Sequence, residues 1–287
     1  MSAVITSDVE WFVPDTAIPV RQGDVLISRN SRSRRIEEIC LVITADCDIS
    51  KGKFGRQLAC LRIVQLEEYI RTVWATRKLE KALKNETEKL RGQVAKWHTL
   101  LIGSASTLSA EATAIWARRE DPKTMCESLQ VPDGDRKKLA GALTSFRSAS
   151  ALLDSMAASG TFSQYVAFRA AVRNQDQQTC RQEALQEAQR ESLPDDVFLL
   201  PSLPQVHTDG AVIMLREVVA IEQGAICYRA ADAQSSDAFL RVGRLQPTFK
   251  YAVSQAFGAL YTRIGLPDSY EERCKGAITN ISNFPWE

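Results

Sequence analysis

Apolar residues follow two different periods along the chain, and the change of period divides the sequence. Before residue 65 and after residue 197, short apolar runs of strand length are separated by polar or glycine-containing turns. Between them, apolar residues recur at the spacing of helices. The predicted strands are Val25–Ile27, Ile39–Thr44, Leu58–Val64, Phe198–Leu200, Ala211–Leu215, Val218–Ile221, Ala225–Tyr228 and Ala238–Val242.

The middle of the chain, Leu66–Ser192, is predicted to be an all-helical lobe of antiparallel helices. One part of it, Gln175–Ser192, is polar throughout and fits either an exposed helix or a cleavable linker. The expected helices are Leu66–Ile102, which could be one long helix or two end to end, Ser109–Arg119, Asp135–Ala158 and Thr161–Glu191. Asp121-Pro122 is expected to reopen the chain after Ser109–Arg119.

Two elements have clear positions in the expected fold. Ile39–Thr44 reads ICLVIT and has no polar face, so we predict a central strand covered on both sides. The last helix begins at Pro247, where the first turn tolerates proline, and ends at Gly265. Its apolar residues share one face, which predicts a helix that packs on the β structure.

The fold class that follows is α+β. Residues 1–65 and 194–246 are each short for a closed core, so we expect them to form one SH3-like β-barrel or rolled sheet together. Residues 66–193 would split that barrel as a helical insertion. Residues 247–287 would supply the packing helix and a tail.

Composition narrows the class of protein. A net charge of +1 speaks against a nucleic-acid binder that relies on global charge. The seven cysteines are scattered without a C-x-x-C pair, as expected for reduced thiols rather than for disulfides or a zinc site. With no signal peptide and no long apolar run, we predict a cytoplasmic protein with no membrane contact, metal or cofactor.

The turn after ICLVIT has the highest density of residues that could act in catalysis or metal binding. Thr44 ends the strand, Asp46 and Asp48 flank Cys47, and the lysines Lys51 and Lys53 follow. The carboxylates could act as bases or metal ligands and the thiol as a nucleophile. Neighbouring carboxylates raise a thiol pKa, however, and no histidine lies nearby in sequence. We therefore favour a structural turn in which the aspartates cap the backbone and Cys47 is buried.

Two further groups of polar residues carry candidate chemistry. The Ser28–Arg35 loop could bind phosphates or could be a solvated loop, and both interpretations stay open. His207 could pair with Asp209 or with the Asp46/Asp48 turn, although an exposed turn histidine is the favoured interpretation. The arginines of the loop are Arg29, Arg32, Arg34 and Arg35.

The N-terminal stretch resembles the barrel of the MazF/PemK toxins. The resemblance covers about Pro19–Val64 and consists of GDVLI, the basic loop, a strand ending in VIT and a polar turn with Lys51. It implies a small SH3-like barrel that cuts RNA or binds partners such as antitoxins. Thr44 could match the toxins' threonine or serine. Glu37-Glu38-Ile39 stands where the toxins have Arg-Pro, so cleavage would require Arg34 or Arg35 instead.

The order of segments is also similar to prokaryotic defence-island proteins. More loosely, it is similar to the MazF-like target subunit of CRISPR-associated Lon protease cassettes, which holds a sigma factor until it is cut. We therefore predict a non-catalytic protein-interaction or regulatory component of an antiviral defence or toxin–antitoxin-like system. Its partner would be another protein, such as a sigma factor.

Two alternatives remain. A MazF-like endoribonuclease would bind RNA through the arginine loop with Lys51 and Lys53, and would use Thr44, Asp46, Asp48 and His207. It needs Arg32, Arg34 or Arg35 at the same cleft as Asp46 and His207. A metal-dependent hydrolase would use Asp46, Asp48, His207 and Asp209, and would lose activity on chelation.

Overall fold

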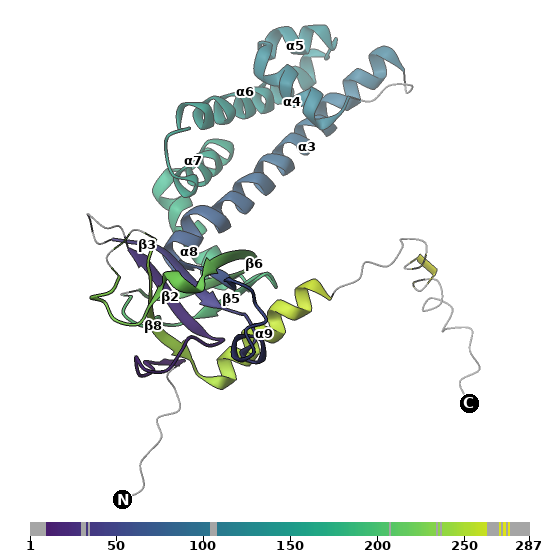
Figure 1. Cartoon of the computed structure of the whole chain (residues 1–287). Coiled ribbons are helices and arrows are strands. Elements are labelled where there is room, and N and C mark those ends of the chain that lie inside the picture. Colours follow the sequence, from purple (N-terminus) through teal and green to yellow (C-terminus); the bar gives the residue numbers. More distant parts are fainter. Residues whose placement is uncertain are drawn as a thin grey trace, which may run out of the picture. The chain divides into compact units, whose positions relative to one another are not determined.

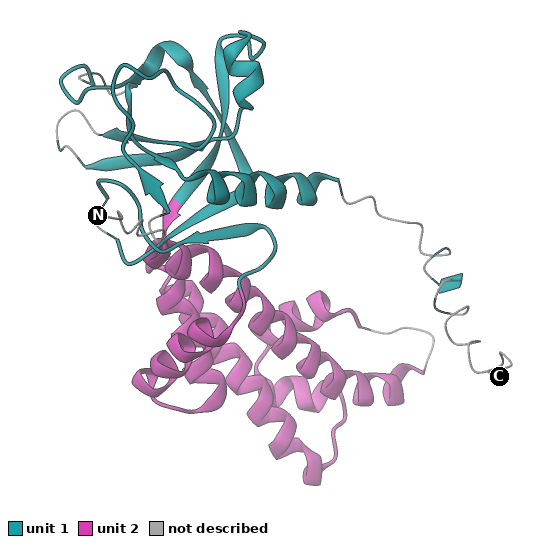
Figure 2. Ribbon diagram, turned by 90° about the horizontal axis from the view of Figure 1, so that it is seen from below, with its two compact units in different colours: residues 1–63, 193–287 teal, residues 64–192 magenta. Residues whose placement is uncertain are grey.

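The chain divides into two compact units. Residues 1–63 and 193–287 form the first, called here the β unit, and residues 64–192 form the second, the helical unit (Figure 2). Within the described part of the chain, no helix is both long and apolar enough to cross a bilayer. The computed structural model describes residues 10–29, 33, 35–103, 108–206, 208–233, 235, 237–262, 270, 272–273 and 275.

The β unit is built on one curled, mainly antiparallel sheet (Figures 1 and 2). Its strands follow the order β1-β8-β2-β3-β4-β6-β5, and β7 pairs with β8 in parallel. Strands from the two ends of the sequence therefore form one sheet, because β8 lies between β1 and β2 while β4 lies beside β6. The strands are β1 (Trp11–Phe12), β2 (Asp24–Arg29), β3 (Ile36–Val42), β4 (Gln57–Gln65), β5 (Val197–Leu200), β6 (Ala211–Glu222), β7 (Ile226–Cys227) and β8 (Phe239–Leu245).

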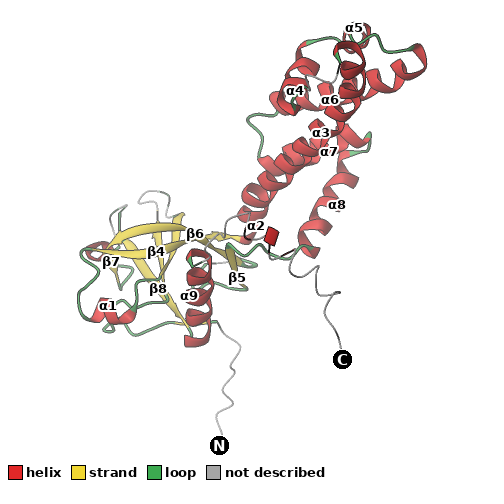
Figure 3. Cartoon of the chain, turned by 90° about the vertical axis from the view of Figure 1, so that its right-hand side faces the viewer, coloured by secondary structure: helices red, strands yellow, loops and turns green. Residues whose placement is uncertain are grey.

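Strand β3 is covered on both faces, which confirms the prediction from its continuous apolar sequence. Ile39 and Leu41 belong to one buried cluster, whereas Cys40 and Val42 belong to another on the opposite face. Helix α9 (Pro247–Tyr261) covers the first face with buried side chains such as Val253 (Figure 3).

Three local predictions about the β unit need correction. The two strands predicted between Ala211 and Ile221 are one strand, β6, because no glycine or proline interrupts the run. The strand predicted at Ala225–Tyr228 shrinks to β7, since a 3-10 turn at Gln223–Ala225 precedes it. The turn after β3 contains a one-turn helix, α1 (Asp46–Ser50).

The helical unit packs around a core that includes Leu90, Val94, Leu139, Leu143 and Phe146. The last three of these recur every three or four residues within the predicted helix Asp135–Ala158, and all three are buried. The elements are α2 (Leu66–Tyr69), a π-helical turn (Ile70–Trp74), α3 (Ala75–Ile102), α4 (Ala110–Arg119), α5 (Pro122–Ser128), α6 (Asp133–Ser155), α7 (Thr161–Arg173) and α8 (Gln177–Arg190).

Two helix boundaries differ from the prediction. Asp121-Pro122 starts a helix rather than reopening the chain, because the Asp121 carboxylate accepts hydrogen bonds from the backbone of Lys123 and Thr124. The predicted helix Thr161–Glu191 is broken at Asn174, whose φ of 53° is left-handed.

The break at Asn174 settles what the polar segment Gln175–Ser192 forms. Its residues 177–190 are helix α8, and Asp176 caps that helix by accepting a hydrogen bond from Thr179 N–H. Cys180 and Ala184 are its buried residues, so the apolar face is narrow. A narrow face explains why the segment could also be interpreted as a linker.

Candidate functional site

Thr44, the predicted site residue after β3, is bonded to the backbone of β4. Its Oγ1 accepts a hydrogen bond from Ala59 N–H at 2.7 Å and donates to the Ala59 carbonyl at 3.4 Å. The hydroxyl therefore continues the ladder between β3 and β4 beyond the last paired residues. This is a structural use of a residue that a nuclease would need in its cleft.

Asp46 holds three distant parts of the β unit together. One carboxylate oxygen accepts a hydrogen bond from Gln22 N–H at 2.9 Å, and the other accepts one from Lys250 Nζ at 2.8 Å. Burial alone would raise the pKa of Asp46, but the hydrogen bonds from Lys250 and Gln22 outweigh it and lower the pKa. The carboxylate is therefore a fixed anion and a weak base, suited to binding α9 rather than to moving a proton.

The rest of this turn is open to solvent. Cys47 is exposed, so its predicted burial is wrong. Ile49 and Phe54 pack against the sheet instead and fill the space that a buried thiol would occupy. Asp48 accepts a weak hydrogen bond from the Cys47 thiol at 3.7 Å, and neither aspartate caps α1. Lys51 and Lys53 are exposed.

The structure does not bring the two described arginines of the loop, Arg29 and Arg35, to Asp46. Arg29 ends β2 and Arg35 precedes β3, whereas Asp46 follows the opposite end of β3. Seven residues of strand separate the two ends by about 20 Å, more than these side chains can bridge. Arg32, Arg34 and His207 lie outside the described residues, and Asp209 is exposed.

Metal chemistry was the third alternative for these residues. Over the described ranges, no group of three or more histidine, cysteine, aspartate or glutamate side chains could hold a metal ion. Asp46 is instead occupied by the Lys250 ammonium.

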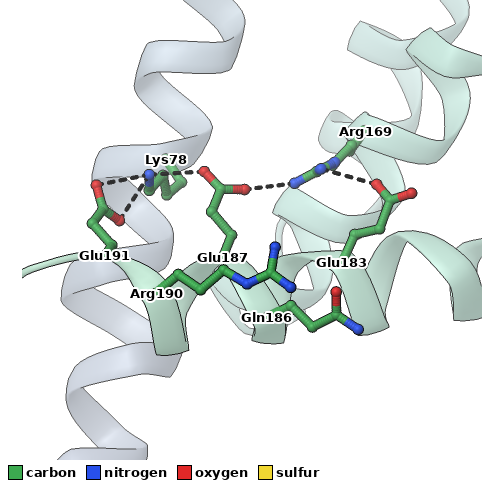
Figure 4. A pocket seen from close by; sticks show the side chains of 7 residues that line it. All are labelled: Lys78, Arg169, Glu183, Gln186, Glu187, Arg190 and Glu191. Carbon is green, nitrogen blue, oxygen red and sulfur yellow. Dashed lines mark hydrogen bonds and ion pairs between the residues drawn. The ribbon is translucent and has the colours of Figure 1, made fainter.

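The helical unit contains a charged groove that the sequence did not lead us to predict (Figure 4). It has a volume of about 520 Å³ and lies among α3, α7 and α8. Its lining residues contribute three cations, three carboxylates and one amide. They are Lys78, Arg169, Glu183, Gln186, Glu187, Arg190 and Glu191.

Ion pairs join the three helices across this groove. Lys78 Nζ lies 2.8 Å from carboxylate oxygens of both Glu187 and Glu191. Arg169 binds Glu187 at 2.7 Å and Glu183 at 2.9 Å. Helix α8 is therefore fastened to α3 by Lys78 and to α7 by Arg169, as the dashed lines in Figure 4 trace.

Each of these charges stabilises its partner. Burial alone would raise the pKa of Glu187, but hydrogen bonds from Lys78 and Arg169 lower it below its usual value. Burial alone would lower the pKa of Lys78, but hydrogen bonds to Glu187 and Glu191 raise it. The groove thus holds ionised pairs and offers no activated nucleophile, which indicates a structural role.

One sequence signal could have revealed the groove. Glu183, Glu187 and Glu191 recur every four residues and so lie on one face of α8. The basic partner residues come from other helices, and Lys78 precedes Glu187 by 109 residues. Spacing along one helix predicts the acidic face but not what covers it.

Large aliphatic side chains are exposed on the α3–α4 hairpin of the helical unit. The exposed fractions are 73% for Leu100, 43% for Leu101, 48% for Ile102 and 50% for Ile115. We call these four residues the apolar tip. Elsewhere on the same helices, residues such as Val94 and Ala117 are buried in the core. The four tip residues lie outside that core cluster.

Comparison with known proteins adds no identification, because no protein family, curated protein or solved structure matches the chain.

Proposed function

We propose that this protein is a non-catalytic interaction component of a prokaryotic antiviral defence or toxin–antitoxin-like system, acting in the cytoplasm on another protein. The observation that carries the proposal is the apolar tip. Exposed apolar patches on a protein surface can mark sites of protein–protein interaction. Leu100, with 73% of its surface exposed, is the centre of this argument.

The β unit supports a binding role in a different way. Thr44 and Asp46, which catalysis would use, are engaged with Ala59, Gln22 and Lys250. Arg29 and Arg35 lie at the opposite end of β3 from Asp46, which weakens the endoribonuclease alternative.

The finer description of fold and system rests on the resemblance over residues 19–64. On that basis, the curled sheet would be an SH3-like barrel and the helical unit an insertion into it. The looser similarity in segment order to the target subunit of CRISPR-associated Lon protease cassettes suggests that the partner is held inactive, and a sigma factor is the partner class that this similarity suggests.

The test begins with the intact, tagged protein as bait in a lysate of its native cells, with and without ribonuclease treatment. Proteins that co-purify are identified by mass spectrometry, and binding is repeated with the purified partner. The test variant is Leu100→Gln/Ile102→Gln/Ile115→Gln, since glutamine keeps good helix propensity. The matched control is Val13→Gln/Val218→Gln, which removes exposed aliphatic surface from the β unit.

We expect the purified partner to bind the native chain and the control with equal affinity, and the tip variant at least tenfold more weakly. Equal loss in both variants would contradict the role of the tip. Recovery of RNA that the purified protein shortens, with no ribonuclease-resistant protein partner, would overturn the proposal in favour of the endoribonuclease.

A further inference from the structure

A second pocket opens on the sheet of the β unit, away from the Thr44–Lys53 turn. Its volume is about 470 Å³, and strands β2, β3, β4, β6 and β8 contribute to it. Pockets at the open mouths of curled sheets are a common place for small ligands. The lining residues are Ser28, Glu37, Glu38, Arg62, Glu217, Val219, Asp237 and Phe239.

The register of the sheet fixes the floor of this pocket. Ser28 pairs with Glu38 on one side and with Phe239 on the other. Directly opposed residues project to the same face, so these three side chains lie together. That face is the one that buries Leu26 and Cys40. The pocket is therefore the polar end of an otherwise apolar layer.

Carboxylates outnumber cations in the lining by four to one. The single cation, Arg62, lies 3.4 Å from a Glu217 oxygen and is partly neutralised there. Glu37 and Asp237 have interactions of their own, so the argument rests on Glu38. Within the described residues, no cation lies within ion-pair distance of the Glu38 carboxylate. Burial raises the pKa of the Cys40 thiol, and the neighbouring Glu38 charge raises it further.

Ser28 provides a second and independent observation. Its side chain lines the pocket although the residue is only 5% exposed. Among the described residues, its hydroxyl has no hydrogen-bond partner. The hydroxyl oxygen remains accessible from the pocket, so a ligand bound there can reach it. The Glu38 carboxylate accepts a hydrogen bond from the Cys40 thiol but has no counter-charge among the described residues, so together with the Ser28 hydroxyl it offers acceptors to a donor-bearing ligand.

We infer that this pocket binds a cationic group, an ammonium or guanidinium carried on a slim aliphatic arm. Its N–H groups would donate to Glu38 and to Ser28 Oγ, giving charge-assisted hydrogen bonds. Val219 and the Phe239 ring would pack against the arm and the cation. A free polyamine and a lysine or arginine side chain of a protein both carry this group. The inference goes beyond the proposed function and does not depend on it.

The experiment titrates the full chain with spermidine and, separately, with a short blocked peptide that contains one arginine. Affinity is measured by calorimetry, and the site is located by amide chemical shifts. We expect shifts at Ser28, Glu38 and Phe239, and an affinity that falls as salt is added. Glu38→Gln should weaken binding at least tenfold and Ser28→Ala several-fold. Glu222→Gln, which removes an exposed carboxylate from β6, should leave it unchanged.

Each of the other possible outcomes either contradicts the inference or identifies the ligand. If Glu222→Gln weakened binding as much as Glu38→Gln, the binding would be non-specific charge attraction and the inference would be wrong. If the ligand changed amide chemical shifts in the unmutated chain elsewhere but not at Ser28 and Phe239, the inference would also be wrong. This result does not depend on whether any variant folds. If Arg32→Ala/Arg34→Ala bound the added ligand more tightly than the native chain does, the chain's own arginines would be the occupant of the pocket. The inference of an external ligand would then be wrong. Stronger binding of spermidine than of the peptide would identify a free polyamine, and the reverse a protein side chain.

Discussion

The two units use charge in opposite ways. In the β unit, Asp24 is fully buried and the Arg241 side chain is 2% exposed. In the helical unit, Lys78 and Arg169 are each 13% exposed and their glutamate partners at least 36%. Water screens the second group and hardly reaches the first. The β unit therefore depends on its buried charges to fix the course of the backbone. The helical unit uses charges near its surface to hold helix α8 in place.

The buried charges of the β unit fix the segment that leads into β2. Asp24 accepts two hydrogen bonds from Arg244, at 2.5 and 3.0 Å, and one from Arg21 N–H. Arg241 donates to the carbonyls of Asp15 and Ile18 and lies over the Tyr228 ring. The Asp24 carboxylate thus compensates two guanidinium groups, and both of these also donate to backbone carbonyls of the segment before β2.

The largest expected effect comes from removing this carboxylate. Asp24→Ala would leave both guanidinium groups buried without a counter-charge, and breaking a buried pair costs about 3–5 kcal/mol. We expect that loss in the free energy of unfolding of the β unit, measured by hydrogen exchange at the Leu26 and Leu41 amides. Asp209→Ala, which removes an exposed aspartate, should change it by less than about 0.5 kcal/mol. A loss below 1 kcal/mol for Asp24→Ala would show that the comparison between the units is wrong.

One substitution made in both units should have opposite signs. A Cβ at Gly243 of β8 would lie 2.5 Å from Pro204 Cγ, 2.8 Å from Pro204 Cβ and 3.3 Å from the Phe12 carbonyl. We expect Gly243→Ala to cost about 1–3 kcal/mol. At Gly92 of α3 nothing lies within 4 Å of a new Cβ, so Gly92→Ala should stabilise the helix by about 0.5–1 kcal/mol. Unit-specific hydrogen exchange measures both, and equal signs would contradict the packing described here.

Patterns within a short stretch of sequence predicted the elements whose structure depends on neighbouring residues alone. The apolar run of β3 and the periodicity of α6 require no distant information, and both were predicted correctly. The break at Asn174 was missed because helix-forming residues continue on both sides of it. Asp121-Pro122 was misinterpreted because aspartate followed by proline suits a turn and a helix start equally well.

The candidate site was harder to predict, because its contacts are long-range. Asp46 and Lys250 are 204 residues apart, and nothing in the spacing of either indicates the other. The exposure of Cys47 depends on Ile49 and Phe54 taking the position against the sheet, which composition cannot decide. The acidic face of α8 was present in the sequence at every fourth residue, and its basic partners became visible only in the folded unit.

The effect that we predict for Glu187 in the charged groove is also small, and it depends on pH. Its pKa in the folded protein is below the ordinary 4.5, so its contribution is present above pH 4.5 and lost as pH falls through the folded value. Lys78, whose pKa is raised, keeps its charge throughout that range. Glu187→Gln should therefore cost about 1 kcal/mol at pH 7, a modest value because Glu187 is about a third exposed.

This prediction sharpens the comparison between the units. Ion pairs near the surface should weaken in acid, whereas a fully buried ion pair should resist acid. Hydrogen exchange at the Ala184 amide of α8, followed from pH 7 to pH 3, should show the difference between native chain and Glu187→Gln closing below pH 4.5. Glu80→Gln, on the solvent side of α3, is the control and should show no difference at any pH. A gap that stayed constant down to pH 3 would mean that the shape of Glu187, rather than its charge, holds α8. The ion pairs that Glu187 makes with Lys78 and Arg169 would then contribute little to holding α8.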